Sequence, residues 1–344
     1  MGHSRLVDVA RATGYSINTV SLALRGSPRV APTTRAKIEE ASQRLGYVPN
    51  RVARSLVEQR TRTIGVVLTD IMNPSLTAVA QHIERDLADR DYSMLLVTTE
   101  QSVERERRAL QVLRAQQVDG ILLFPVSHTA LGHIAAAHDE RRPLVLLAGD
   151  RGADADLVAV DNEAGAAAAV RHLLDLGHRR IGLLNGGVRI GNSEKLRGYR
   201  SALRAAGIKP DPALEVAPNG FSHADGFQAA ASLFDRAPDA TALLASTDQL
   251  AIGALAWCAM SSRRVPDDVS VVGFDDTEAA TYCQPPLTSV VYESGRVAHE
   301  SVRRLMERIQ GAPDGRAVAY ERMVMSPKMS IRASSGPAPV PHHT

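Results

Sequence analysis

The chain has 344 residues, of which 44% are hydrophobic and 23% charged, so its composition is that of a folded, water-soluble protein. This length exceeds what a single hydrophobic core usually supports, and two or three domains are expected. Two cysteines, Cys258 and Cys283, are too few for a disulfide framework, which favours a reducing compartment. No apolar leader follows Met1 and no run of about 18 apolar residues occurs, so the sequence predicts a cytoplasmic protein without membrane spans.

The net charge of +2 is distributed unevenly along the chain. Residues 1–62 contain eleven Lys or Arg and four Asp or Glu, which gives this segment +7 and leaves −5 for the remainder. A small basic segment joined to a larger acidic one is typical of a nucleic-acid-binding protein with a separate sensing or assembly domain. A segment that binds a membrane surface would have the same charge, so the residue pattern has to discriminate between the two.

Three short helices are predicted in the basic segment. The spacing of apolar residues indicates a first helix over residues 6–13, which Gly14 ends. Ser16 can cap a second helix over 17–24, and a third is expected over 32–45 with a proline in its first turn. The first two form a candidate helix-turn-helix, and the third can complete a shared core.

The second helix carries side chains suited to the major groove of DNA. Its apolar stripe is expected to face the core, leaving Ile17, Asn18 and Leu22 outward. Asn18 can pair with the edge of an adenine, and Ile17 or Leu22 can pack on a thymine methyl. Neighbouring hydroxyl and guanidinium groups can bind phosphates, although each of them could instead be a solvated or helix-capping residue. The predicted DNA contacts in this segment are Ser16, Ile17, Asn18, Thr19, Ser21, Leu22, Arg25, Arg29 and Thr34.

From residue 62 onward, short apolar runs alternate with helical stretches. Continuous apolar strands between helices indicate parallel sheets covered on both faces, and the pattern restarts after residue 162, which indicates two α/β lobes. The chain should cross between the lobes near 161, 291 and 320, with a helix over 293–311 in the first lobe and a strand over 321–325 closing the second. The strands are expected at 64–68, 94–97, 120–124, 144–147, 180–184, 242–245 and 269–274.

Ligands bind such sheets beyond the carboxyl ends of the strands. That rule alone nominates Asp70, Phe124, Asp150, Asn185, Thr247, Asp248 and Asp275. Asp248 is expected to be a helix N-cap rather than a ligand contact, and Phe124 could belong to the core. The motifs Gly-x-Ser-x-Gly and His-Glu-x-x-His and the Walker loop are absent, so neither enzymatic activity nor a metal or other cofactor is expected. A transport-type sugar-binding protein is the alternative for this acidic part, but the basic segment argues against it.

Several short stretches together resemble the LacI-type (lactose and galactose repressor) family of bacterial transcriptional regulators. In the basic segment they are residues 7–10 (VDVA), 19–21 (TVS), 34–35 (TR) and 45–56 (LGYVPNRVARSL). In the acidic part they are residues 177–178, 195–199, 247–254, 265–276 and 286–288. The resemblance extends to about residue 331.

This resemblance implies an all-α helix-turn-helix head and a hinge helix, followed by a two-lobed α/β sensor domain that is periplasmic-binding-protein-like and has parallel sheets. It implies a transcriptional regulator, most often a repressor, that binds a pseudo-palindromic double-stranded operator as a homodimer and responds to a small effector. The Pro-rich end lacks heptads, which favours a dimer over a tetramer. The expected domains are a DNA-binding head over 1–48, a hinge over 49–61, a first lobe over 62–161 and 292–320, a second lobe over 162–291 and 321–332, and a disordered tail over 333–344.

The resemblance also implies roles for individual residues. Asn50, Ala53 and Leu56 of the hinge would contact DNA, with Leu56 entering the minor groove at the central base step. Phe221 would stack on an apolar ligand face and Asp275 would accept paired hydroxyls, which suggests a sugar or another polyol. Lys195 and Leu22 stand where family members often have arginine, and Ala148 where aspartate is common. The implied effector-binding residues are Ser75, Leu76, Phe124, Lys195, Phe221, Thr247, Asp275 and Tyr292.

Overall fold

The computed structural model describes residues 4–47, 60–127, 131–135, 142–149, 155–186, 192–311 and 319–340. The chain divides into two compact units, Met1–Arg62 and Thr63–Thr344, which are described separately. Within the described residues, no helix combines the length and apolar character needed to cross a bilayer.

The first unit is a bundle of three short helices, as predicted. They are α1 (Leu6–Thr13), α2 (Ile17–Leu24) and α3 (Pro32–Arg44). Gly14 ends α1 with a φ of 73°, a left-handed conformation that suits glycine. The Ser16 side chain accepts a hydrogen bond from the Thr19 amide and so caps α2. The shared core consists of Val9, Ala10, Val20, Ala23, Val30, Ile38 and Ala41.

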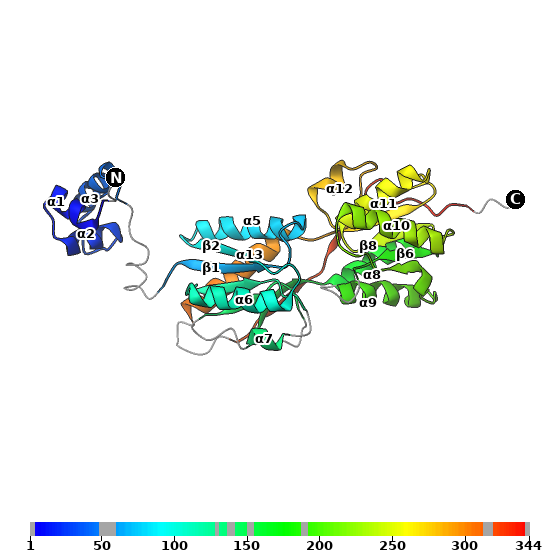
Figure 1. Ribbon diagram of the computed structural model, residues 1–344, viewed down its shortest axis with the longest axis horizontal. Helices are drawn as coiled ribbons and strands as arrows, with labels where there is room; N and C mark the ends of the chain where they lie inside the picture. Colours follow the sequence, from blue (N-terminus) through cyan, green and yellow to red (C-terminus); the bar gives the residue numbers. More distant parts are fainter. Residues whose placement is uncertain are drawn as a thin grey trace. The chain divides into compact units, whose positions relative to one another are not determined.

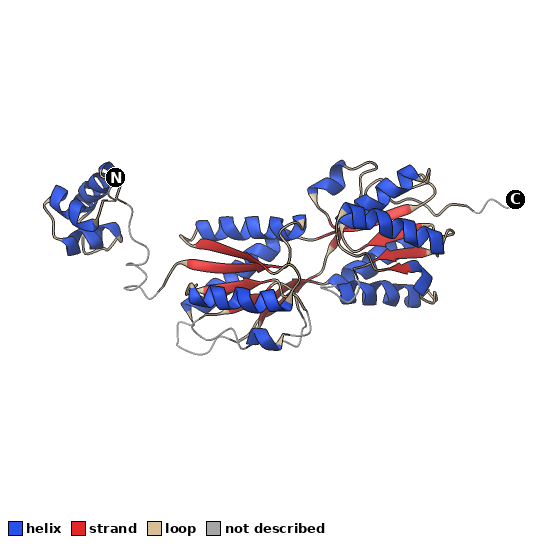
Figure 2. Cartoon of the chain, viewed as in Figure 1, coloured by secondary structure: helices blue, strands red, loops and turns tan. Residues whose placement is uncertain are grey.

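The second unit contains two lobes, each built on a six-stranded sheet with helices on both faces (Figures 1 and 2). In the first lobe the strand order is β11-β5-β4-β3-β1-β2, and every neighbouring pair is parallel. The strands are β1 (Thr63–Leu68), β2 (Ser93–Thr98), β3 (Gly120–Leu123), β4 (Leu144–Leu146), β5 (Asp156–Val160) and β11 (Arg322–Met325).

The helices of the first lobe cover its sheet because its strands are apolar on both faces. Successive residues of β1, such as Val66 and Val67, point to opposite faces of the sheet and belong to two different core clusters. One cluster includes residues of α5 (Pro74–Ala88) and α13 (Ser294–Gln310), and the other includes residues of α6 (Val103–Ala115). The short helix α7 (Gly132–Ala135) follows β3.

The second lobe repeats this plan with the strand order β12-β10-β9-β8-β6-β7, in which only β12 is antiparallel to its neighbour. Its strands are β6 (Ile181–Leu184), β7 (Glu215–Val216), β8 (Ala242–Ala245), β9 (Ser270–Asp275), β10 (Thr288–Val291) and β12 (Lys328–Ser330). Its helices are α8 (Asn162–Asp175), α9 (Asn192–Ala205), η1 (Pro212–Leu214), α10 (His223–Arg236), α11 (Asp248–Met260) and α12 (Glu278–Tyr282).

One strand lies in the lobe opposite to the predicted one. The sequence predicts that a strand over 321–325 closes the second lobe. This strand is β11, and it pairs in parallel with β5 of the first lobe instead. The Met325 side chain is buried in the first lobe's core, and the Glu321 amide donates to the Asp156 carboxylate at 2.9 Å. The third crossing therefore follows Met325 rather than lying near 320, and β12 is the strand that completes the second sheet.

The prediction of a disordered tail from residue 333 is also wrong over the residues described. Ser334 is fully buried, accepts a hydrogen bond from the Thr288 amide at 2.8 Å and donates one to the Val271 carbonyl at 2.6 Å. The Ala338 amide donates to the Leu176 carbonyl at 2.8 Å. The segment through residue 338 thus packs on the second lobe because its polar groups have partners there.

Candidate functional site

The outward face of α2 is arranged as a groove-reading helix requires. Val20 and Ala23 are fully buried, whereas Ile17 is 50% exposed and Asn18 is exposed. Ser16 is exposed, and Thr19 and Ser21 are half-buried. The N-terminal half of the helix therefore presents an amide and an apolar side chain to the surroundings, as readout of base edges needs.

The other predicted contacts in the head differ in how accessible they are. Leu22, expected to point outward, is half-buried because it packs against the head's core. The Arg25 Nε donates to the Ser21 carbonyl at 3.1 Å, which holds this guanidinium beside the C-terminus of α2. Arg29 is exposed and Thr34 half-buried. The predicted hinge contacts Asn50, Ala53 and Leu56 lie outside the described residues.

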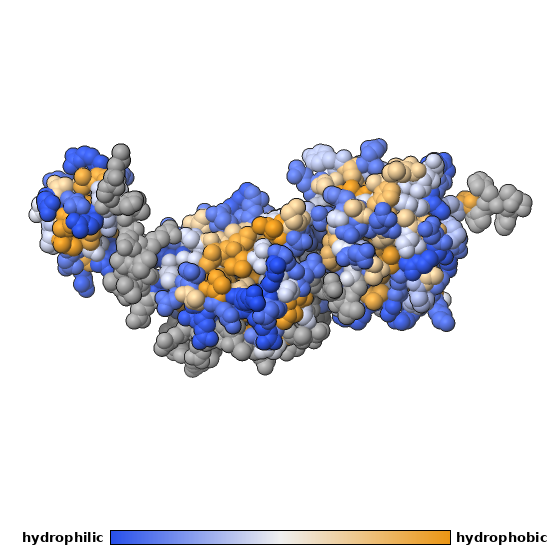
Figure 3. All heavy atoms as spheres, in the orientation of Figure 1, coloured by the Kyte–Doolittle hydropathy of each residue, from blue (hydrophilic) through white to orange (hydrophobic). Residues whose placement is uncertain are grey.

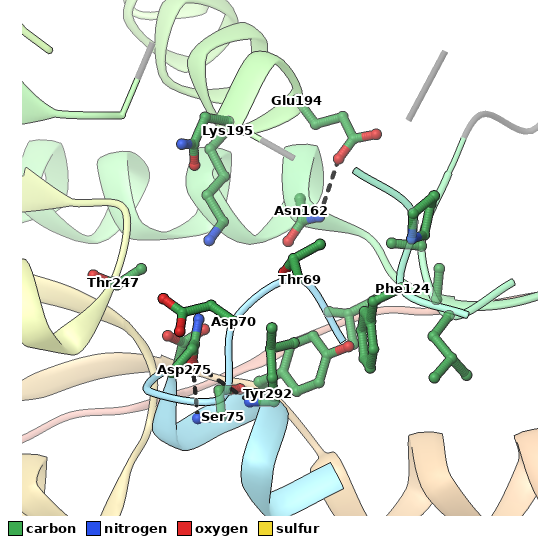
Figure 4. A pocket seen from close by; sticks show the side chains of 18 of the residues that line it. Thr69, Asp70, Ser75, Phe124, Asn162, Glu194, Lys195, Thr247, Asp275 and Tyr292 are labelled. Atoms are coloured by element: carbon green, nitrogen blue, oxygen red, sulfur yellow. Dashed lines mark hydrogen bonds between the residues drawn. The ribbon is translucent and has the colours of Figure 1, made fainter. Parts of the chain in front are cut away.

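A cavity in the second unit is lined by residues from both lobes (Figure 4). It encloses about 960 Å³ of space free of protein atoms, part of which is open to solvent. All eight residues predicted to bind an effector line it: Ser75, Leu76, Phe124, Lys195, Phe221, Thr247, Asp275 and Tyr292. The fold therefore brings together side chains that lie up to 217 positions apart in the chain.

The carboxyl ends of strands and the first turns of helices supply most of this lining. Asp275 ends β9, Phe124 follows β3, and Thr247 caps α11 by accepting a hydrogen bond from the Leu250 amide at 3.3 Å. Asn73 caps α5 by accepting one from the Ser75 amide at 2.9 Å. Parallel strands place all these ends at one edge of each sheet, and the two edges face one another across the cavity.

Asp275 is held in an unusual backbone conformation at the cavity wall. Its φ is 117° and that of Asp276 is 54°, both in the region that L-residues rarely adopt. The Asp276 carboxylate pairs with the Arg332 guanidinium at 2.7 Å and accepts a hydrogen bond from the Ser330 hydroxyl at 2.8 Å. These contacts hold the strained turn in place. Burial raises the pKa of the Asp275 carboxyl, and the nearby Lys195 ammonium opposes that shift.

Lys195 enters the cavity from α9 and is 8% exposed. Its Nζ donates to the Ser246 carbonyl at 2.7 Å and lies 3.7 Å from the centroid of the Phe274 ring. Burial lowers the pKa of this ammonium, whereas the negative charge of Asp275 raises it. Figure 4 shows Lys195 on one side of the cavity and Asp275, Tyr292 and Ser75 on the other.

Asn192, at the start of α9, is only 2% exposed, and its side-chain nitrogen has no hydrogen-bond partner within the described residues. The side-chain Nδ2 of Asn185 donates to the backbone carbonyl of Asn192 at 3.0 Å and so fixes the backbone there. Gly186 leaves room for this arrangement, because a Cβ at that position would lie 2.6 Å from the Phe221 ring and 2.8 Å from the Asn192 nitrogen. Phe221 and Asn192 thus both occupy the space beside Gly186.

The sequence did not predict every residue that lines the cavity, and some residues predicted to bind a ligand do not line it. Asp70, nominated from its position after β1, lies in the wall, whereas Asn185 does not and Asp150 is outside the described residues. Asp248 is not the N-cap of α11, which is Thr247; it is a buried acceptor for the Thr277 amide and the Ser289 hydroxyl, both at 2.6 Å. Burial raises its pKa to about 6. The missed polar lining residues, whose only signal is a place after a strand or in a helix's first turn, are Thr69, Asn73, Gln101, Asn162, Asn192 and Glu194.

Comparisons with known proteins agree with this architecture. Residues 5–50 match the family described as bacterial regulatory proteins, lacI family, and residues 170–335 match the periplasmic binding protein-like domain. The HTH-type transcriptional regulator CelR of Thermobifida fusca is 34% identical, and the match covers 95% of this chain and 96% of CelR. This relative is a transcriptional regulator, which agrees with the expectation that the chain is not an enzyme.

Two solved structures show the same likeness over nearly the whole chain. The Lac repressor dimer bound to operator and the anti-inducer ONPF has a TM-score of 0.87 at 28% identity, covering 97% of this chain and 100% of the repressor. A CelR–cellobiose complex has a TM-score of 0.72 at 32% identity, covering 96% and 100%. With its helix-turn-helix head and its two-lobed sensor domain, the chain belongs to the LacI family of DNA-binding bacterial transcriptional regulators.

Proposed function

We propose that this regulator binds a pseudo-palindromic operator as a homodimer and that a sugar or related polyol, bound in the cavity between the lobes, changes its affinity for that operator. The observation that carries the proposal is the cavity, because both lobes supply its walls. A ligand held by both lobes can change their relative orientation, as in hinge closure around small molecules. The cellobiose bound to CelR supports a carbohydrate as the ligand class.

The chemistry of the lining also fits a sugar. Phe124, Phe221 and Leu76 offer apolar surface for the C–H face of a pyranose or furanose ring. Asp275 and Asn192 offer an acceptor and a donor at the cavity wall, and hydroxyl groups can satisfy both. Few polar groups among apolar ones are typical of a small-molecule site.

An exposed sheet edge supports the homodimer. The strand β2 is the outer strand of the first sheet, and all six of its residues are half-buried although four of them, Met94 to Val97, are apolar. Figure 3 shows an apolar area on this lobe between α5 and α6. An apolar edge strand exposes unpaired backbone groups and is usually covered, and the Lac repressor's dimeric state makes a second copy the proposed cover.

The proposal can be tested by measuring how the protein binds DNA duplexes that have been selected in vitro for binding to it. Fluorescence anisotropy should detect two protomers per selected site, with affinity falling as salt rises, because phosphate contacts release counterions. Adding the sugar that binds the cavity should shift the operator affinity. A salt-independent signal, or one protomer per site, would contradict operator binding as proposed, and a transport-type sugar-binding protein would give no DNA binding at all.

The predicted hinge gives a second test. We expect Leu56→Ala to weaken binding to the selected operator by about tenfold or more, because the wedge at the central step is lost. Binding to random-sequence DNA should hardly change, since it depends on phosphate contacts. Arg60→Ala is a control that removes a positive charge and should weaken both. Equal loss on both kinds of DNA for Leu56→Ala would rule out the wedge.

A further inference from the structure

We infer that a second space beside the cavity holds a further sugar residue, so that the effector is a disaccharide. This inference deepens the proposed function and rests on it, because it concerns the effector of the same cavity. The second space, which we call the side chamber, lies between residues of β5 and β11 in the first lobe and residues of α8 and α9 in the second. It contains about 1530 Å³ free of protein atoms, part of which is open to solvent, against about 960 Å³ for the cavity. The side chamber is therefore the larger of the two spaces.

The cavity and the side chamber share one boundary. The described residues that line both spaces are Gly149, Ala159, Val160, Asn162 and Glu194. The Asn162 Nδ2 donates to the Glu194 carboxylate at 3.0 Å, and Figure 4 shows this hydrogen bond beside the cavity. A sugar ring in the cavity and a ring in the side chamber would be neighbours at this boundary, as the two residues of a disaccharide are.

The first lobe gives the side chamber an apolar wall. Ala159 of β5 and Val324 of β11 are register partners in the sheet, and both line the chamber. Leu157 lines it as well, and it points to the same face of the sheet because it precedes Ala159 by two positions. All three side chains pack in the same core cluster. The C–H groups on the face of a sugar ring can pack on this wall and so leave water.

The second lobe gives the side chamber a polar wall. Glu194, Arg197 and Ser201 are spaced three and four residues apart, so they lie on one face of α9. The Arg197 Nε donates to the Glu163 carboxylate of α8 at 3.1 Å. The two helices lie close together, because a Cβ on Gly198 would come within 2.1 Å of the Glu163 carbonyl oxygen. This wall offers donors and acceptors for sugar hydroxyls opposite the apolar wall, as a ring with C–H faces and a polar rim requires.

Titration calorimetry with the full chain tests whether a second ring contributes to binding. The disaccharides cellobiose, lactose, maltose and trehalose are compared with glucose and galactose, the monosaccharides from which all four are built. We expect at least one disaccharide to bind at least about tenfold more tightly than its monosaccharides. The physical reason is that the second ring adds contacts in the side chamber without a second loss of translational freedom.

Two variants test whether the second ring lies in the side chamber. Ser201→Trp fills the chamber from an exposed position, and Arg197→Ala removes a charged donor whose exposed ion pair with Glu163 adds little to stability. Neither residue lines the cavity. In both variants the disaccharide should lose about tenfold in affinity or more, whereas the monosaccharide should bind as before. The matched controls are Ser232→Trp on α10 and Arg204→Ala on α9, exposed positions that line neither space.

The outcomes separate this inference from the proposed function. If a monosaccharide binds as tightly as every disaccharide, the inference is overturned and a sugar-responsive regulator remains. A preference for a disaccharide that survives either variant also overturns the inference, because the second ring would then lie elsewhere. If neither a monosaccharide nor a disaccharide binds, the sugar effector of the proposed function itself is overturned.

Discussion

Asp275 and Asp276 show how single residues are placed by parts of the chain far from them in sequence. Two consecutive residues with positive φ cost about 1–3 kcal/mol each, so the neighbouring structure must hold them. Arg332 provides one such contact through its ion pair with Asp276, and the Tyr292 amide provides another by donating to the Asp275 carbonyl at 3.1 Å. Strain held in this way is common where a side chain must face a ligand.

Phe221 should provide most of the apolar contact to a bound sugar. We expect Phe221→Ala to lower the affinity for the effector by about tenfold or more, because a stacked ring contributes on the order of 1 kcal/mol to binding beyond the contribution of its buried area. Operator affinity without effector should not change. Titration calorimetry measures the effector affinity, and fluorescence anisotropy measures the operator affinity. Tyr320→Ala is the control, because it removes an aromatic ring outside the cavity. An unchanged effector affinity would remove Phe221 from the binding surface.

At the scale of elements, the segment after β3 is fastened to α6 by one buried side chain. Glu106 is fully buried, accepts a hydrogen bond from the Val126 amide at 2.6 Å and contacts the His133 ring of α7. Phe124 and Pro125, which line the cavity, directly precede Val126. Glu106 is therefore a positioning residue for this part of the wall.

Replacing Glu106 should affect both stability and ligand binding. Glu106→Ala leaves the Val126 amide and the His133 ring without their acceptor, and we expect the free energy of unfolding to fall by about 2–6 kcal/mol, about 1–3 kcal/mol for each group. Glu106→Gln keeps an acceptor for the Val126 amide, so this variant should lose less stability. It should still bind the effector more weakly than the unaltered chain. Urea unfolding and calorimetry test this, with exposed Glu104→Gln as the control on the same helix. Equal effects of the Glu106 and Glu104 substitutions would contradict the positioning role.

The C-terminal segment should make stability depend on pH. His178 is fully buried, its Nε2 lies 3.0 Å from the Gly336 carbonyl and its Nδ1 3.0 Å from the Thr241 hydroxyl; burial lowers its pKa. A histidine whose pKa is lowered on folding binds protons more readily in the unfolded chain. The contribution of His178 to the free energy of unfolding is therefore fully present above the pKa of about 6.5 that a histidine has in the unfolded chain, and it is lost as pH falls below that value.

We expect the free energy of unfolding to fall between pH 7 and pH 5 by a smaller amount in His178→Gln than in the unaltered chain. The difference between the two proteins isolates His178, because Asp275, whose pKa is raised, contributes with the opposite sign in both. Urea unfolding at each pH measures it. If both proteins lost the same stability, the histidine would already be charged in the folded state or solvated.

The sequence was most informative where a local rule decides the structure. Caps and apolar spacing were sufficient to predict α1, α2 and α3, and strand ends were sufficient to nominate Asp275 and Phe124. The local sequence could not predict which lobe β11 joins, because its four residues could pair with either sheet. Its contacts with Asp156 and with the core of the first lobe place it in the first sheet. Asn192 was missed because a polar residue opening a helix looks like an ordinary cap.

At the scale of the whole molecule, the proposed cavity and the head must be coupled if the effector regulates operator binding. The chain crosses between the lobes after β5, β10 and β11, so both lobes contribute the polar groups that a ligand would contact. A ligand with equal affinity for both arrangements of the lobes would change nothing, however tightly it bound. The effect on DNA therefore requires differential affinity, usually about 1–3 kcal/mol.

Thermodynamic reciprocity turns this coupling into a measurement. The factor by which saturating effector changes operator affinity must equal the factor by which saturating operator changes effector affinity, and we expect both to be about 5- to 150-fold. Anisotropy with and without effector gives the first factor, and titration calorimetry with and without operator duplex gives the second. Asp275→Asn must also give two equal factors, and if it removes only a ligand contact made in both arrangements of the lobes, these factors should match those of the unaltered chain although the effector binds more weakly. If operator leaves effector affinity unchanged while the added sugar alters operator binding, the sugar acts at a place other than the measured site, and the cavity is not the regulatory site.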